Sequence, residues 1–279
     1  MTIRDLLREG NDKLFYAEVD TPFLDAALLL SHAMGTRKER LLASLPEEAD
    51  PEAGERFRQF VDRRCRGEPV SYIRRIKEFY GLEFYVDDGV LVPRPDTESL
   101  VEKALELARH DPGIRDVHDA CTGSGCVCIA LQHDAPHLNL SASDISPFAG
   151  TVFRENCRRI LGREIPFLLS DLLDGVPGPF HLITANPPYL SDKEVDDMRK
   201  VGWPEPEVSL RGGPEGTELP GRLIRRAAGR LVPGGWLVME AAPGQFLKLR
   251  ALMDAAGFRD VEVLPDLAGR ERVIAGRRA

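Results

Sequence analysis

The sequence contains no long apolar run. The longest, Ala26 to Leu30, is far too short to cross a bilayer. The first residues, Met1-Thr2-Ile3-Arg4-Asp5, lack the basic start and the apolar stretch of a secretory signal. We therefore expect a cytoplasmic protein that makes no use of a membrane.

A surplus of positive charge is also lacking. The chain has 37 Lys and Arg against 45 Asp and Glu, a formal net charge of −8. This balance provides no large basic face for a nucleic-acid backbone, although a local basic patch stays open. Cys-x-x-Cys spacing is missing as well, and the odd number of cysteines predicts reduced thiols with neither a disulfide nor a metal site. The cysteines are Cys65, Cys121, Cys126, Cys128 and Cys157.

The first part of the chain, residues 1–72, has the pattern of a helical domain. Asp20-Thr21-Pro22 supplies cap residues and a first-turn proline for a helix that reaches Leu30. Arginines recur between residues 53 and 66, and we interpret them as a solvated helix face rather than a docking surface. Residues 73–92 then predict a β-hairpin linker: one strand from Phe79 to Val86, a turn at Asp87-Asp88-Gly89, and a second strand from Val90 to Val92.

From residue 93 to 279 the pattern changes to alternating helices and short apolar strands. Such alternation predicts an α/β fold with a doubly wound, largely parallel sheet. The last two strands are too close in sequence for a helix between them, so we expect them to form an antiparallel hairpin at the sheet edge. The expected strands cover residues 115–120, 138–143, 166–169, 180–185, 235–240, 260–264 and 272–276.

The segment Asn186-Pro187-Pro188-Tyr189, called here the NPPY segment, follows the apolar strand 180–185. It therefore lies at the carboxyl edge of the sheet, where open α/β sheets bind ligands. Asn186 Oδ1 and the Pro187 carbonyl can accept the two hydrogens of a planar NH2 group, and the Tyr189 ring can cover its flat face. Asn-Pro and Pro-Pro also form simple turns, so the NPPY segment alone leaves that alternative open.

Three earlier strands end in residues suited to a nucleoside-containing cofactor. The first ends in the glycine loop, Cys121-Thr122-Gly123-Ser124-Gly125, whose N–H groups can face a ligand. The second ends at Asp144, which can accept both hydroxyls of a ribose. The third ends at Asp171 and Leu172, a carboxylate for an adenine amine and an apolar wall for its ring. A nicotinamide dinucleotide is disfavoured, because Cys128 stands where the third glycine of its binding loop would be.

The chain resembles the protein-(glutamine-N) methyltransferases of the HemK/PrmC type over nearly its whole length. The similarity rests on Gly67-Glu68-Pro69-Val70-Ser71-Tyr72-Ile73, Glu78-Phe79-Tyr80-Gly81-Leu82, the loop Pro93-Arg94-Pro95-Asp96-Thr97-Glu98, the glycine loop, Asp144-Ile145-Ser146, the NPPY segment, Glu205-Pro206 and Glu271-Arg272-Val273. Among these, the NPPY segment is shared with amino-methylating DNA enzymes, whereas the 93–98 loop is more specific. Cys121 departs from the glycine usual in that family.

This resemblance implies a class I, Rossmann-like methyltransferase sheet of seven strands behind a helical substrate-recognition domain. It further implies S-adenosylmethionine as cofactor and methylation of the glutamine side chain in a Gly-Gly-Gln loop of peptide chain release factors, with no nucleic-acid substrate. Asn186, Pro187, Pro188 and Tyr189 are the expected catalytic and substrate-binding residues. Arg94 and Pro95 are expected to contact the substrate. The alternatives are a DNA adenine methyltransferase, a glutamine methyltransferase for a ribosomal protein, and an inactive cofactor-binding adaptor.

Overall fold

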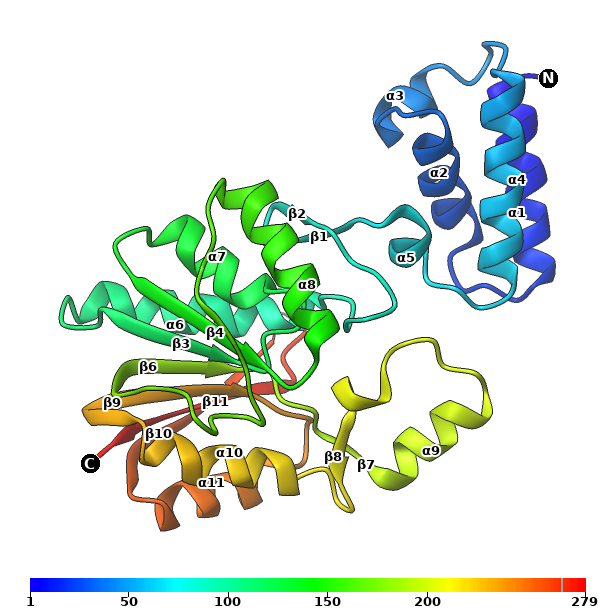
Figure 1. The fold of residues 1–279 in the computed structure, drawn as a ribbon. Coiled ribbons are helices and arrows are strands. Elements are labelled where there is room, and N and C mark those ends of the chain that lie inside the picture. The colour runs from blue at the N-terminus through cyan, green and yellow to red at the C-terminus, as the bar shows by residue number, and fades with distance from the viewer. Residues whose placement is uncertain (267) are drawn as a thin grey trace. The chain divides into compact units, whose positions relative to one another are not determined.

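The computed structural model describes residues 1–266 and 268–279. It divides into two compact units, residues 1–76 with 202–204 and residues 77–201 with 205–279. Both are drawn in Figure 1. Among the described residues, no helix combines the length and the apolar character that a membrane span requires.

The first unit is helical, as its sequence predicts. Thr2 begins the first helix with a reciprocal capping box to Asp5, and Asp50 caps the fourth helix just before Pro51. Arg58 pairs with Glu9 at 2.8 Å, consistent with a helix face occupied by ion pairs. The helices are α1 (Ile3–Tyr16), α2 (Pro22–Ala33), α3 (Lys38–Ala43), α4 (Pro51–Cys65) and α5 (Val70–Arg74).

A short hairpin opens the second unit, at a different place from the predicted one. β1 (Lys77–Phe79) pairs with β2 (Leu82–Phe84), so the turn is Tyr80-Gly81 and not Asp87-Asp88-Gly89. Both turn residues have positive φ, 52° and 71°, which is the backbone that twisted two-residue hairpins need. The predicted strand at 90–92 is absent from the described structure, because Asp87 instead accepts the Gly89 N–H at 3.0 Å and closes a local turn.

The rest of this unit is built on a sheet of seven strands in the described part of the chain, in the order β10-β11-β9-β6-β3-β4-β5. β3, β4, β5, β6 and β9 are parallel, and β11 enters antiparallel between β10 and β9. The predicted closing hairpin and the doubly wound sheet are therefore confirmed. The strands are β3 (Asp116–Ala120), β4 (Asn139–Asp144), β5 (Phe167–Leu169), β6 (Phe180–Ala185), β9 (Leu231–Glu240), β10 (Phe258–Pro265) and β11 (Glu271–Arg278).

Helices cover both faces of the sheet (Figure 1). α6 (Glu98–His110), α7 (Cys126–Asp134) and α8 (Pro147–Asn156) lie on one face, and α10 (Glu218–Ala228) and α11 (Phe246–Ala255) lie on the other. An apolar cluster lies between the sheet and α10 and α11, and its burial stabilises the fold. It includes Ile183, Leu223, Ile224, Leu237, Met239, Leu249 and Met253.

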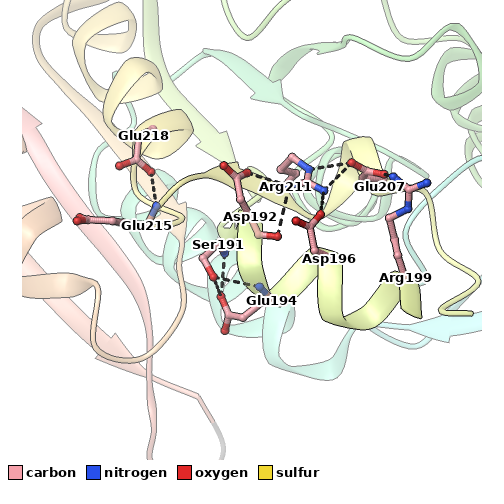
Figure 2. Close-up of polar contacts among 9 residues, drawn as sticks. All are labelled: Ser191, Asp192, Glu194, Asp196, Arg199, Glu207, Arg211, Glu215 and Glu218. Carbon is pink, nitrogen blue, oxygen red and sulfur yellow. Dashed lines mark hydrogen bonds and ion pairs between the residues drawn. The ribbon is translucent and has the colours of Figure 1, made fainter. Parts of the chain in front are cut away.

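One segment, residues 190–213, leaves the sheet between β6 and α10. It contains β7 (Leu190–Ser191), α9 (Asp192–Lys200), a 3-10 turn (Glu207–Ser209) and β8 (Arg211–Gly213). β7 and β8 pair in parallel, which returns the chain to the end of the NPPY segment. Ser191 begins α9 with a capping box to Glu194 (Figure 2).

Candidate active site

A cavity of about 460 Å³ lies at the carboxyl edge of the sheet in the second unit. This volume is within the range of roughly 300–1,000 Å³ that is typical of ligand pockets. The cavity contains most of the residues that the sequence singles out. Those that line it are Arg94, Cys121, Thr122, Gly123, Ser124, Asp144, Asp171, Leu172, Asn186 and Pro188.

Four predicted site residues do not line this cavity: Pro95, Gly125, Pro187 and Tyr189. Gly125 has a structural task, because a Cβ on it would lie 2.5 Å from the Phe153 ring. Pro95 begins a 3-10 turn, Pro95–Thr97, that leads into α6. Their roles in binding stay predictions.

The glycine loop is strained at its first residue. Cys121 has a φ of 57°, in the left-handed region that costs an L-residue roughly 1–2 kcal/mol. Behind it, the buried Asp119 accepts hydrogen bonds from Thr122 Oγ1 at 2.6 Å and Thr184 Oγ1 at 2.8 Å. These bonds tie the loop to β6, so the structure around Cys121 fixes a conformation that its own side chain disfavours.

Asp144 presents a prepared pair of acceptors. Its two oxygens each receive one backbone N–H, from Gly123 and from Ser146, both at 2.9 Å. Burial raises the pKa of this carboxyl, and the two N–H groups oppose the rise. A carboxylate oxygen that accepts one N–H keeps capacity to accept another hydrogen, so Asp144, which lines the cavity, can accept from the hydroxyls of a ribose.

Asp171 and Leu172 form the next part of the wall. Leu172 is buried and has a φ of 56°, a second strained residue at the cavity. The Asp171 carboxylate pairs with Arg222 at 2.6 Å and also with Arg226. No sequence pattern indicated these arginines, and an adenine amine would share the carboxylate with them.

The NPPY segment carries a defined pattern of hydrogen bonds. Asn186 Nδ2 donates to Thr97 Oγ1 at 3.2 Å, which leaves Asn186 Oδ1 as an acceptor. The Tyr189 hydroxyl donates to Glu240 Oε1 at 3.1 Å, and burial next to that carboxyl raises the pKa of Tyr189. Tyr189 is therefore anchored at its hydroxyl end.

The 190–213 segment closes one side of the cavity with Glu207, Val208, Ser209 and Arg211. Figure 2 shows Arg211 among three carboxylates, with its guanidinium 3.0 Å from Asp192, 2.7 Å from Asp196 and 2.7 Å from Glu207. These contacts join α9, the 3-10 turn and β8. We call this group the Arg211 cluster, and it holds the cavity wall in place.

A second ion pair holds the loop before α6. Glu205 accepts the Val92 N–H at 3.0 Å through one oxygen and pairs with Arg94 through the other. Arg94 is thus oriented at the cavity while its guanidinium stays half-exposed.

Several residues at or behind this cavity were not singled out as site residues from the sequence: Thr97, Asp119, Arg211 and Glu240. Asp119 and Glu240 lie at the carboxyl ends of β3 and β9, so an acid at the end of an apolar strand was the available signal. Thr97 and Arg211 carried no such signal, because Thr97 meets Asn186, 89 residues away, and Arg211 meets Asp192, 19 residues away.

The fold and the donor set of this cavity define a class I S-adenosylmethionine-dependent methyltransferase. Residues 98–201 match the methyltransferase small domain, and residues 5–74 match the PrmC N-terminal domain. Solved structures share the fold: a 16S rRNA methyltransferase of T. thermophilus in complex with AdoMet and guanosine (TM-score 0.55, 19% identity, 73% of this chain, 50% of that chain) and a methyltransferase of Pyrococcus furiosus (TM-score 0.53, 15% identity, 78% of this chain, 98% of that chain).

The chain belongs to the release factor glutamine methyltransferase family. It is 40% identical to the release factor glutamine methyltransferase of Moorella thermoacetica over 276 residues, which are 98% of this chain and 97% of that one. It is 37% identical to that of Deinococcus radiodurans over 279 residues, 100% of this chain and 99% of that one. The resemblance found in the sequence is thereby confirmed.

Proposed function

We propose that this protein methylates the side-chain amide nitrogen of the glutamine in the Gly-Gly-Gln loop of peptide chain release factors. One observation carries the proposal: the Asn186 NH2 group donates a hydrogen bond to Thr97, which keeps Asn186 Oδ1 as an acceptor at the cavity. An acceptor there suits a substrate NH2 group. Release factors act in translation, so the reaction is proposed to take place in the cytoplasm, without a nucleic-acid substrate.

The cofactor side of the cavity is proposed to hold S-adenosylmethionine. Asp144 binds the ribose hydroxyls, the glycine loop from Cys121 to Gly125 approaches the amino-acid portion, and Asp171 with Leu172 faces the adenine. When bound, this cofactor supplies a methyl group on a positively charged sulfur.

The substrate side of the cavity is proposed to position the amide nitrogen of the glutamine rather than to remove a proton from it. Asn186 Oδ1 and the Pro187 carbonyl accept the two amide hydrogens, which aims the nitrogen at the methyl group. Pro188 and Tyr189 limit the space around the amide, and Arg94 and Pro95 contact the polypeptide on either side of the glutamine. As the N–C bond forms and the S–C bond breaks, the nitrogen becomes acidic and loses one proton to solvent. Holding two reactants near attack distance contributes roughly 7–11 kcal/mol to such a reaction.

A transfer assay tests this proposal. The purified protein is incubated with methyl-labelled S-adenosylmethionine and, separately, a release factor, a ribosomal-protein mixture and duplex DNA. Label in the Gly-Gly-Gln peptide of the release factor is the expected result. Label only in DNA or only in a ribosomal protein would refute the proposed substrate, and no label anywhere would favour an adaptor.

Two variants separate the two sides of the cavity. Asn186→Ala is expected to lose about a hundredfold or more in turnover while its cofactor affinity stays near wild type. Asp144→Ala is expected mainly to weaken cofactor binding. Asn139→Ala is the matched control, because this residue lies at the opposite end of β4. Wild-type turnover in both Asn186→Ala and Asp144→Ala at saturating substrates would contradict the assigned roles.

A further inference from the structure

Asn156, the last residue of α8, joins two walls of the cavity. Its side chain is fully buried and makes three hydrogen bonds to backbone groups. Oδ1 accepts the Tyr85 N–H at 2.7 Å, and Nδ2 donates to the Tyr85 carbonyl at 2.9 Å. Nδ2 also donates at 2.9 Å to the carbonyl of Ser124, a residue of the glycine loop that lines the cavity. One buried amide therefore holds the chain just after β2 and the glycine loop at the same time.

The chain after β2, residues 85–91, is called here the 85–91 segment. Its last three residues line the cavity, whereas Tyr85 does not. Within the segment, Asp87 accepts the Tyr85 hydroxyl and the Gly89 N–H, both at 3.0 Å. These two bonds close the path from Tyr85 to the cavity, so a residue that fixes Tyr85 also restrains the wall beyond it.

α8 contacts the 85–91 segment at both of its ends. At the first turn of α8, a Cβ added to Gly89 would lie 3.1 Å from the Phe148 Cβ, so the segment passes close to the helix there. At the last residue, the Asn156 amide pairs with both backbone groups of Tyr85, as a neighbouring strand would. A π-helix, Cys157–Leu161, follows directly, and such wide turns are frequent at functional sites.

The chemistry of an amide side chain suits all three backbone partners of Asn156. An N–H group needs an acceptor and two carbonyls need donors, and asparagine offers an oxygen and an NH2 group on one short side chain. A carboxylate would have no hydrogen for the carbonyls. An alkyl side chain would leave the three backbone groups without this partner in a buried place, which is costly.

We propose that Asn156 is a positioning residue that holds the glycine loop and the 85–91 segment together as one preformed wall for the cofactor. A site whose walls are already in place loses less conformational freedom when its ligand binds. Asn156 itself does not line the cavity, so it acts through the two segments and not by contact with the ligand. This role rests on the proposed placement of S-adenosylmethionine in the cavity.

Thermodynamic linkage makes the effect measurable from two sides. If breaking the Asn156 hydrogen bonds weakens cofactor binding by some factor, bound cofactor must stabilise those bonds by the same factor. The net loss of one or two hydrogen bonds corresponds to about a tenfold change in affinity. The loss of affinity in a variant and the protection that the cofactor gives to the wild type should therefore agree.

Cofactor affinity in variants provides the first test, measured by calorimetry with the demethylated cofactor S-adenosylhomocysteine. Asn156→Ala is expected to raise the Kd about tenfold. Gln132→Ala is the matched control, because Gln132 is a buried amide of α7 that donates to the Leu138 carbonyl at 3.3 Å and does not line the cavity. Its Kd should stay within about twofold of the wild type. An unchanged Kd in Asn156→Ala would overturn the inference.

Release-factor methylation separates positioning from a purely structural role. Asn156→Ala should raise the KM for S-adenosylmethionine about tenfold, with kcat within about twofold of the wild type, because it removes binding that is equal in the ground state and the transition state. A purely structural role would instead lower the amount of active protein, and with it kcat, at an unchanged KM. That second pattern would overturn the inference.

Hydrogen exchange in the wild type provides a further test that needs no variant and no methyl acceptor. Saturating S-adenosylhomocysteine is expected to slow exchange of the Tyr85 N–H, which donates to Asn156, by about tenfold, although Tyr85 does not line the cavity. Slower exchange in the glycine loop with an unchanged Tyr85 N–H would overturn the inference, even if Asn156→Ala did not fold. Unchanged exchange in both segments would refute the proposed cofactor placement and the inference with it. Slower exchange in both, with release factors left unmethylated, would support the inference and refute the proposed substrate.

Discussion

Replacing Asp119 by Asn is expected to change how the stability of the second unit depends on pH. Asp119 is 1% exposed, near the end of β3, and its oxygens accept only from the hydroxyls of Thr122 and Thr184 among described side chains. Burial raises its pKa from the ordinary 3.8 to about 7. The Asp119 carboxyl therefore stays protonated in the folded protein at a pH where it is ionised in the unfolded chain.

The sign and size of the effect follow from proton binding. Between pH 4 and pH 7 the folded state holds this proton and the unfolded state does not, so the contribution to stability is lost as pH rises through 7. A pKa difference of about three corresponds to roughly 4 kcal/mol in full, at about 1.4 kcal/mol for each pKa unit. Between pH 5 and pH 8 the change amounts to about 2–3 kcal/mol. The Asp119→Asn variant has no titrating group at this position, so this pH-dependent change in stability is absent from it.

Urea unfolding at several pH values measures this change. The chain has two tryptophans, so a Trp203→Phe background leaves Trp236 of β9 to report on the sheet. Burial lowers the pKa of His118 to about 4, so the protein also loses stability as pH falls below 6.5, the opposite direction to the Asp119 effect. Only the difference in the free energy of unfolding between the Asp119→Asn variant and its parent is therefore compared. The free energy of unfolding of Asp119→Asn, relative to that of its parent, should rise by about 2–3 kcal/mol between pH 5 and pH 8. A difference that does not vary with pH would refute the assigned protonation.

Three further changes probe the cavity and the structure next to it. Gly216→Ala would place a Cβ 2.2 Å from the Tyr189 carbonyl oxygen, so it should unfold in urea more easily than Gly244→Ala, which has a similar φ and open space, by about 1–3 kcal/mol. Arg211→Lys keeps the charge but loses the forked contacts of the Arg211 cluster; it should raise KM for the release factor about threefold to tenfold with a stability loss of at most about 1 kcal/mol. If Arg211→Lys and the wild type had equal KM values for the release factor, the Arg211 cluster would play no part in substrate binding. Cys121→Gly relieves the left-handed strain and should raise the free energy of unfolding by up to about 1 kcal/mol; a clear loss would mean that the thiol packing outweighs the strain.

Most of the sheet could be predicted, because short apolar runs ending in Gly, Asp or Asn are typical of parallel strands. The expected strand at 180–185 has the bounds of β6. Asn186, which follows this strand, lines the cavity together with Asp144. Local sequence was enough here, since parallel strands bring their ends to one edge.

The early hairpin was predicted wrongly for a physical reason. Asp87-Asp88-Gly89 is a strong turn signal, and it does form a turn, but β1 and β2 pair across the two-residue turn Tyr80-Gly81. The Tyr80 N–H is bound by Glu98, a contact that no local pattern reveals. In the same way, the link from Glu240 to Tyr189 joins positions 51 residues apart and depends on the folded sheet. The division at residues 72 and 92 and the substrate-recognition role of the helical part stay predictions.

The place of β11 in the sheet affects how the protein is made. It is synthesised after both β9 and β10, yet it inserts between them. Until residues 271–278 have left the ribosome, one backbone edge of β9 is open, and an open apolar edge recruits other chains. Chains that stall earlier are therefore expected to aggregate or to require a chaperone. Val273, which pairs with Glu240, also arrives at this stage, so the carboxyl end of β9 gains its antiparallel neighbour only once β11 is in place.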